Sequence, residues 1–398
     1  MTNQRRGLLT NDVFMALLGV AAIMIGTTLP EMIRSFGLTL SQGGLIVSAE
    51  STGGLTAMFA GLLLADRIRK PLWILITVVL VGLLLGLAGL SPGYWVLVVV
   101  FFVLGIVARF LDLLLNAHTG DLAPKNRTQT MTVLHMVYGI GAFIGPSMAR
   151  WLLDQSLPWN SVYWIVGGTY LTVAALSLIR TRGYLNLADA SPADNEAEMS
   201  AQAGAPDPEN TRRQWVSVIL LGFVVLFYAV HQVGTTSWLP YYLETTLGVR
   251  PAIASAGLSF YWAGIIASRF LVSRIGSRIG ETRVLVWGSV FGGVVLVGSV
   301  LLASPFVAIA GFILAGVLTG ATIPLTMALA HGHLPWRTGS ATAVVYGLMM
   351  IGRLIGPWSI GCVGDRLGLD VGILIAAGVL FIAALAAYLV SRRDRKFA

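Results

Sequence analysis

Long apolar runs separated by short polar connections follow one another along almost the whole chain. A helix that crosses the hydrocarbon core of a membrane needs about 20 mainly apolar residues. Twelve such runs can be drawn, at residues 12–33, 42–64, 71–90, 93–118, 129–153, 159–180, 214–240, 251–273, 282–303, 305–331, 338–362 and 369–391. The pattern predicts an all-α polytopic membrane protein with twelve transmembrane helices.

Two of the divisions between runs rest on very short connections. Ser91-Pro92-Gly93 separates the third run from the fourth, and Ser304-Pro305 separates the ninth from the tenth. The length of the apolar stretch on either side, together with the Pro break, predicts two helices rather than one in each case.

The composition agrees with a membrane protein throughout. Of the 398 residues, 56% are hydrophobic and 11% are charged, whereas a soluble domain keeps about a quarter of its residues charged. A net charge of +8 could indicate a nucleic-acid partner, but charges that flank membrane spans explain it better. We therefore expect a lipid bilayer as surroundings, no nucleic acid, no cofactor or metal and a monomer. The single cysteine, Cys362, excludes a disulfide framework.

The basic residues between the runs predict the orientation. With the N-terminus inside, nineteen Arg and Lys residues flank the inner ends of the runs, and only Arg34, Arg150, Arg250 and Arg366 flank the outer ends. Because cytoplasmic loops carry the excess of Arg and Lys, we expect both termini in the cytoplasm of a bacterial cell, with the chain in the inner membrane.

A polar, acidic segment rich in Ala and Pro divides the chain. It lies between Tyr184 and Arg213, and such a composition needs no packed structure. We expect an N-terminal half at residues 1–183, a flexible cytoplasmic linker at 184–213 and a C-terminal half at 214–398.

The two halves are related in sequence. Residues 133–154 align without gaps on residues 344–365, so that Gly141 meets Gly352 and Gly145-Pro146 meets Gly356-Pro357, an offset of 211 residues. At the same offset Phe101, Gly105 and Pro124 meet Phe312, Gly316 and Pro335. With six runs each, the halves share one orientation and form a parallel repeat.

Two parallel six-helix halves joined by an inner linker resemble the major facilitator superfamily of transporters. The segment from Gly61 to Lys70 resembles the family's loop between helices two and three, although Leu62 stands where the family has Gly and the Gly between the basic residues is missing. The resemblance implies that Asp66 is an inner-side latch in gating.

A second resemblance concerns one branch of that superfamily. Asp112 and Asn116, followed by Leu134-His135 and then Gly139, Gly141-Ala142 and Gly145-Pro146, resemble the fucose:proton symporter and related sugar transporters. The Gly141-x-x-x-Gly145-Pro146 pattern alone also resembles a signature of exporters. The resemblance implies a secondary active transporter, with a proton as coupling ion and a sugar as substrate.

The chemistry is expected in the hairpin from Arg109 to Pro146. Arg109, Asp112 and Asn116 are spaced so that they share one helix face. Charges surrounded by apolar residues are costly unless they are paired and used. Burial disfavours a charged carboxylate and a guanidinium favours it, so Asp112 is our candidate for the coupling proton, with Arg109 and His135 beside it. A static Arg109–Asp112 pair and a structural His135 are the alternatives.

Glu50 and Arg353 form a second candidate pair. Each lies sixteen residues from a charged residue at the predicted inner end, Asp66 and Arg337 respectively, which puts both at matching height in the outer half. In the fold that the chain resembles, the helices that carry them face each other, so the pair is a candidate outer gate. The alternative is that each charge faces the cavity independently.

The predicted substrate-binding residues are polar or aromatic and lie within the apolar runs. They are Asn116, Tyr138, His231, Gln232, Tyr261, Trp262 and Tyr346.

Three functions are considered for this sequence. The first is a proton-coupled transporter of a small polar solute such as a sugar, and the second is an exporter of amphipathic drugs or lipid-like molecules on the same fold. The third, a membrane enzyme or sensor, has only His331-Gly-His333 as a metal-like feature and no nucleophile–base arrangement or nucleotide loop. We therefore expect a transporter and not an enzyme.

Overall fold

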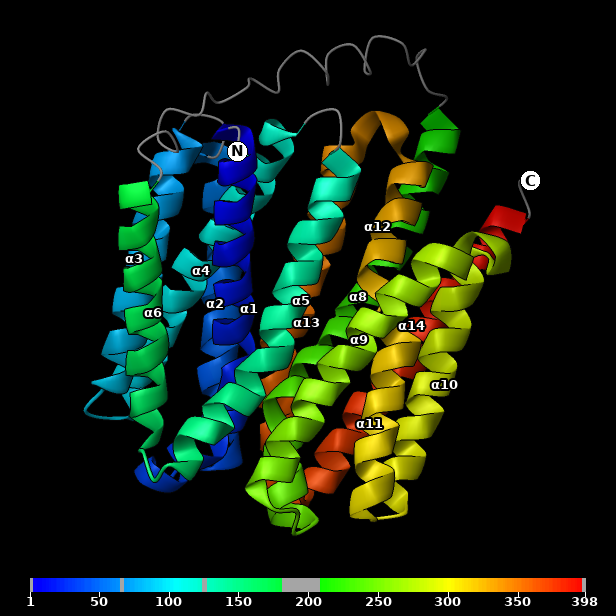
Figure 1. Ribbon diagram of the computed structural model, residues 1–398. Helices are drawn as coiled ribbons and strands as arrows, with labels where there is room; N and C mark the ends of the chain where they lie inside the picture. The colour runs from blue at the N-terminus through cyan, green and yellow to red at the C-terminus, as the bar shows by residue number, and fades with distance from the viewer. Residues whose placement is uncertain (1–2, 65–67, 124–126, 181–207, 396–398) are drawn as a thin grey trace. The chain divides into compact units, whose positions relative to one another are not determined.

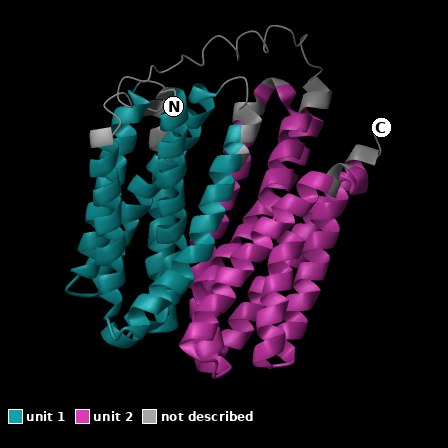
Figure 2. Ribbon diagram, viewed as in Figure 1, with its two compact units in different colours: residues 1–192 teal, residues 193–398 magenta. Residues whose placement is uncertain are grey.

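The computed structural model describes residues 3–64, 68–123, 127–180 and 208–395. The chain divides into two compact units, residues 1–192 and 193–398 (Figure 2). Most of the predicted linker lies outside the described residues, but helix α8 begins at Pro208, inside the segment that was predicted to be irregular.

The described residues of unit 1 form six long helices, which Figure 1 draws from blue to green. They are α1 (Asn3–Phe36), α2 (Leu40–Leu64), α3 (Lys70–Gly89), α4 (Tyr94–Leu122), α5 (Arg127–Asp154) and α6 (Trp159–Arg180). The division predicted at Ser91-Pro92-Gly93 is confirmed, because α3 ends at Gly89 and α4 begins at Tyr94.

Unit 2 repeats this plan with one difference. Its helices are α8 (Pro208–Tyr241), the short π-helix η2 (Tyr242–Thr246), α9 (Pro251–Ile279), α10 (Glu281–Leu301), α11 (Pro305–Thr319), α12 (Thr322–His333), the 3-10 turn η3 (Pro335–Arg337), α13 (Thr338–Leu367) and α14 (Leu369–Arg395). The tenth run, predicted as one helix, is broken into α11 and α12.

Counting α11 and α12 as one span, the described residues form the twelve predicted spans. Ten segments are long and apolar enough to cross a membrane by length and composition. The other two, α2 and α5, are 25 and 28 residues long, which exceeds the span of a bilayer core.

The helices of each unit pack in the same pairs. In unit 1, α1 packs on α5, α2 on α4 and α3 on α6; in unit 2, α8 packs on α13, α9 on α11 and α10 on α14. Corresponding helices therefore have corresponding partners, as a parallel repeat requires.

The glycines that the halves share explain how these pairs approach. A Cβ atom at Gly141 would lie 2.0 Å from the carbonyl oxygen of Ala16, and one at Gly352 would lie 2.2 Å from that of Leu226. No side chain fits at either position, so these glycines let the backbones of paired helices touch.

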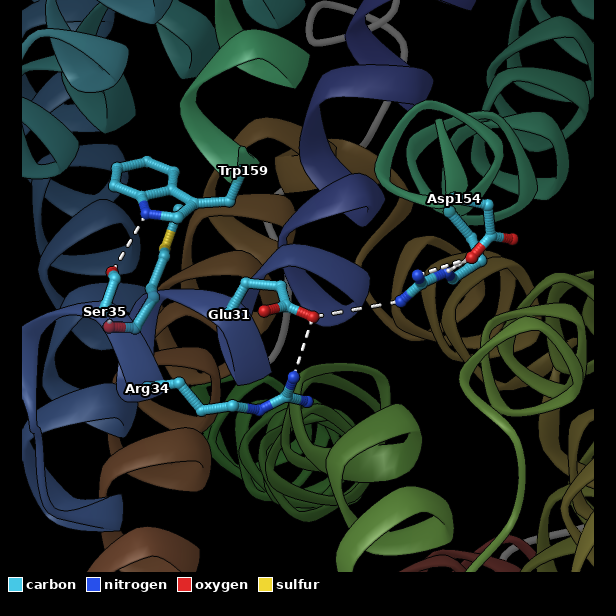
Figure 3. A network of polar contacts seen from close by, with 7 residues as sticks. Glu31, Arg34, Ser35, Asp154 and Trp159 are labelled. Carbon is cyan, nitrogen blue, oxygen red and sulfur yellow. Dashed lines mark hydrogen bonds and ion pairs between the residues drawn. The ribbon is translucent and has the colours of Figure 1, made fainter. Parts of the chain in front are cut away.

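Polar side chains tie three helices together at the predicted outer end of unit 1 (Figure 3). Arg150 of α5 lies 3.9 Å from Glu31 of α1 and 2.5 Å from Asp154, one turn along α5. The indole Nε1 of Trp159, the first residue of α6, donates to Ser35 Oγ at 3.0 Å. This network fixes the ends of α1, α5 and α6 relative to one another.

The opposite end of unit 1 holds a buried ion pair. Lys70 Nζ lies 2.8 Å from Asp121 Oδ2, and the two side chains are only 5% and 15% exposed. Lys70 is the first residue of α3, where a positive charge is unfavourable, so Asp121 offsets both that charge and its desolvation.

We expect Lys70→Met to destabilise the protein much more than Arg34→Met. Removing one partner of a buried pair costs roughly 3–5 kcal/mol. Arg34 also lies in an ion pair, 2.9 Å from Glu31, but its side chain is 52% exposed, and such pairs contribute about 0–1 kcal/mol. Thermal unfolding in detergent measures the difference; equal melting temperatures of the two variants would contradict it.

Candidate functional site

Three of the predicted polar residues meet on one face of α4. Arg109 Nη1 donates to Asp112 Oδ2 at 2.6 Å, and Asn116 Nδ2 donates to Asp112 Oδ1 at 3.0 Å. Asn116 Nδ2 also lies 2.8 Å from the backbone oxygen of Asp112. The spacing predicted from the sequence is therefore confirmed as a direct network in which both carboxylate oxygens of Asp112 accept a hydrogen bond.

This network is neither on the surface nor fully enclosed. The side chains of Arg109 and Asp112 are 27% and 20% exposed. Both oxygens of the Asp112 carboxylate are therefore engaged by donors, while part of the side chain stays accessible.

Glu50 of α2 joins the same neighbourhood, which we did not predict. A Cβ atom at Gly105 of α4 would lie 1.9 Å from the backbone oxygen of Glu50, so the two helices touch at this level. Arg109 is one turn further along α4, and Glu50 and Asp112 both interact with it electrostatically. Two carboxylates from different helices are therefore within electrostatic range of one guanidinium, and Asp112 is the one that it contacts directly.

A glycine of α2 and a tyrosine of α5 lie near the Arg109 side chain. A Cβ atom at Gly54 would lie 3.6–3.7 Å from atoms of the Arg109 side chain, which therefore lies along the bare backbone of α2. Tyr138 of α5 is also within electrostatic range of Arg109. The glycines near Glu50 and within α4 were the sequence signal for this approach.

His135 is more exposed than Tyr138. Its side chain is exposed on α5, whereas that of Tyr138, one turn along the same helix, is half-buried. The part that we predicted for His135 beside Asp112 stays a prediction.

Unit 2 holds a buried polar group built around His231 of α8. His231 Nδ1 lies 3.2 Å from the backbone oxygen of Ala376, and Nε2 lies 3.4 Å from the hydroxyl of Tyr261. A carbonyl oxygen can only accept, so Nδ1 carries the hydrogen and Nε2 accepts from Tyr261. Thr235 Oγ1 lies 3.3 Å from Nδ1.

The remaining predicted substrate residues in unit 2 differ in burial. Gln232 and Trp262 are 5% exposed, and Tyr346 of α13 is half-buried. The structure thus brings His231 and Tyr261 into contact. Gln232 follows His231 in α8, and Trp262 follows Tyr261 in α9. Contact of any of them with a solute stays a prediction.

The gating role of Glu50, Arg353 and Asp66 stays a prediction. Asp66 lies outside the described residues. Glu50 and Arg353 are each half-buried and belong to different units, and their pairing stays a prediction.

His331, one of the two histidines that the sequence offers as a metal-like feature, is engaged by a hydroxyl. His331 Nε2 lies 2.8 Å from Thr342 Oγ1, and within the described part of the chain no three His, Cys, Asp or Glu side chains are grouped to hold a metal ion.

The chain is similar in sequence to known membrane transporters. The family model of the Major Facilitator Superfamily matches residues 13–335 and 239–398. The glucose/mannose transporter GlcP of Bacillus subtilis is 22% identical, over 93% of this chain and 91% of that protein. The gentisate transporter of Corynebacterium glutamicum is 25% identical, over 95% of this chain and 86% of that protein.

Solved structures of transporters share the fold. A bacterial homologue of the human lysosomal transporter Spinster matches with a TM-score of 0.80 at 16% identity, covering 100% of this chain and 98% of that one. A POT family transporter also gives a TM-score of 0.80, at 13% identity, covering 97% and 96%. With the family model matched from residue 13 to the last residue, and with twelve spans arranged as two repeats, the chain belongs to the Major Facilitator Superfamily and is a multi-pass membrane transporter.

Proposed function

We propose that this transporter is proton-coupled and moves a small polar solute, such as a sugar, across the bacterial inner membrane by alternating access. The observation that carries the proposal is the group formed by Arg109, Asp112 and Glu50, in which the guanidinium bonds to Asp112 at 2.6 Å and is within electrostatic range of Glu50. Buried ionisable groups within membrane spans typically mark proton or substrate pathways.

The geometry supports a specific role for each member of the group. Asp112 binds the proton when water reaches it from one side, which weakens its hydrogen bond to Arg109. Arg109 keeps a negative neighbour in Glu50, so the guanidinium does not lose its counter-charge at that moment. Release of the proton to the other side restores the 2.6 Å bond.

The polar group of unit 2 supports a neutral solute rich in hydroxyls. Gln232, on the same helix as His231, is 5% exposed, and its amide can donate to and accept from the hydroxyls of a sugar without net charge. Both ring nitrogens of His231 are already engaged by Ala376 and Tyr261. The relative from Bacillus subtilis is described as a glucose/mannose transporter. The second candidate is an exporter of amphipathic molecules, which the fold also serves.

Uptake by proteoliposomes tests the proposal. The panel consists of labelled glucose, mannose and gentisate, with a cationic dye for the exporter function, each with and without an imposed pH gradient. We expect a sugar to accumulate only with the gradient. Accumulation of gentisate alone would change the substrate class, dye extrusion would favour the exporter, and movement of a sugar that ignores the gradient would contradict proton coupling.

The orientation is tested by single cysteines at Ser191 and at Thr246, introduced after replacement of Cys362. Thr246 ends the π-helix η2 at the predicted outer end of unit 2. We expect a membrane-impermeant maleimide to label intact cells at 246, whereas position 191 should react only after the membrane is opened. Labelling of both positions from the same side would overturn the predicted orientation.

A further inference from the structure

A proline lies just after the break in the tenth span. Proline has no backbone N–H and cannot donate to the carbonyl four residues before it. Pro324 lies in the first turn of α12, and the residue four before it is Gly320, at the junction with α11. The carbonyl of Gly320 therefore lacks its helical donor. Within a membrane span such a group needs another partner.

Two adjacent residues of α9 satisfy the backbone at this break. Arg269 Nε donates to the carbonyl oxygen of Gly320 at 3.3 Å, and the backbone N–H of Ala321 donates to Ser268 Oγ at 3.1 Å. Ser268 is 1% exposed. The guanidinium thus replaces the amide that Pro324 lacks, and the serine accepts from the next residue.

The approach of α9 to the break is tight. A Cβ atom at Gly320 would lie 2.6 Å from the Cα atom of Ile265. The C-terminal end of α11 carries partial negative charge, which favours a guanidinium there. A charged donor to a carbonyl in a low dielectric is also stronger than a neutral one. Arg269 therefore both satisfies the carbonyl and complements the helix end.

The corresponding position in unit 1 is occupied by a different kind of residue. At the offset of 211 residues that relates Gly141 to Gly352, Gly320 corresponds to Arg109. In unit 1 the guanidinium is that of Arg109 on α4, and it donates to the carboxylate of Asp112. In unit 2 the guanidinium is that of Arg269 on α9, and it donates to the backbone carbonyl of Gly320. At this offset Pro324 corresponds to Leu113, and α4 is unbroken from Tyr94 to Leu122.

We propose that Arg269 is a positioning residue of the transport cycle, which sets the angle between α11 and α12 by standing in for the amide of Pro324. Its effect reaches the polar side chains that α12 carries. Thr322 and Thr326 are 4% and 0% exposed, and the Thr326 hydroxyl has no hydrogen-bond partner within the described residues. This inference goes beyond the proposed function, because it does not depend on which solute is carried.

The test is a double-mutant cycle between Arg269→Met and Pro324→Ala. Alanine at 324 supplies an N–H that can donate to Gly320, so it should make the guanidinium dispensable. We expect Arg269→Met to speed hydrogen–deuterium exchange across residues 316–328 about tenfold, the loss expected for one hydrogen bond to a charged donor. Adding Pro324→Ala should return exchange to the wild-type rate. Arg274→Met, at an exposed position further along α9, is the control and should change nothing.

Counterflow of labelled glucose by the same variants gives a second readout. Arg269→Met should slow it, and the double variant should recover. If Arg269→Met does not fold, recovery of a monodisperse protein by the added Pro324→Ala supports the proposal. A double variant as impaired as Arg269→Met, or exchange unchanged in Arg269→Met, would overturn it. Because exchange needs no solute, its result stands even if glucose is not carried.

Discussion

Asp112→Asn should abolish accumulation of the transported solute against its gradient while leaving solute exchange across the membrane intact. The asparagine oxygen can still accept from Arg109, which lies 2.6 Å from the carboxylate in the wild type, and the volume is unchanged. The amide cannot bind and release a proton at any accessible pH. The accumulation ratio should therefore fall to about one, since binding and alternating access persist but the driving force no longer acts.

Asp154→Asn is the matched control for this experiment. Asp154 is also held by an arginine, at 2.5 Å from Arg150, but it lies at the end of α5 and is 44% exposed. We expect normal accumulation in that variant. If Asp112→Asn accumulates solute as the wild type does, Asp112 is only a structural partner of Arg109 and the proton site lies elsewhere.

Gly105→Ala should destabilise the protein by up to about 2 kcal/mol, although alanine is the better helix former. The gain in helix propensity is about 1 kcal/mol. Against it stands the contact of the new methyl group, which would lie 1.9 Å from the backbone oxygen of Glu50. Overpacking of that kind costs about 1–3 kcal/mol. Because α2 has to move away from α4, the variant should also lose transport, as Glu50 leaves the neighbourhood of Arg109.

Gly86→Ala provides the comparison, since a Cβ atom there meets nothing within 4 Å. It should be as stable as the wild type or more so, and transport normally. Thermal unfolding in detergent, followed by uptake assays on both variants, measures these effects. Equal stability of Gly105→Ala and Gly86→Ala would mean that α2 and α4 adjust at no cost, and that Glu50 is not held in place by Gly105.

The fold was predictable because its main determinant is local along the chain. Each span needs its own apolar run, and the repeat of Gly141-x-x-x-Gly145-Pro146 at 352–357 revealed the two halves without any contact information. The break of the tenth span was not predicted, because hydropathy does not register a lost backbone hydrogen bond. Pro324 was the available signal, but only contact with Arg269 shows how a break is tolerated there.

The candidate site was predictable where its residues share a helix. The spacing of Arg109, Asp112 and Asn116 was enough to put them on one face. Glu50 was assigned to a gate with Arg353 by counting residues from the inner end, which gives depth but not the neighbouring helix. Its place near Arg109 depends on how closely α2 approaches α4 at Gly105, and that is a tertiary property.

Substrate-driven proton movement tests the coupling most directly. Proteoliposomes that contain the wild-type protein and an internal pH-sensitive dye receive the transported solute with no imposed gradient, and the Asp112→Asn variant is measured in parallel. We expect solute entry to acidify the interior in the wild type, and solute entry without any pH change in the variant. Solute entry into wild-type vesicles with no movement of protons would contradict proton coupling and the role of Asp112 together.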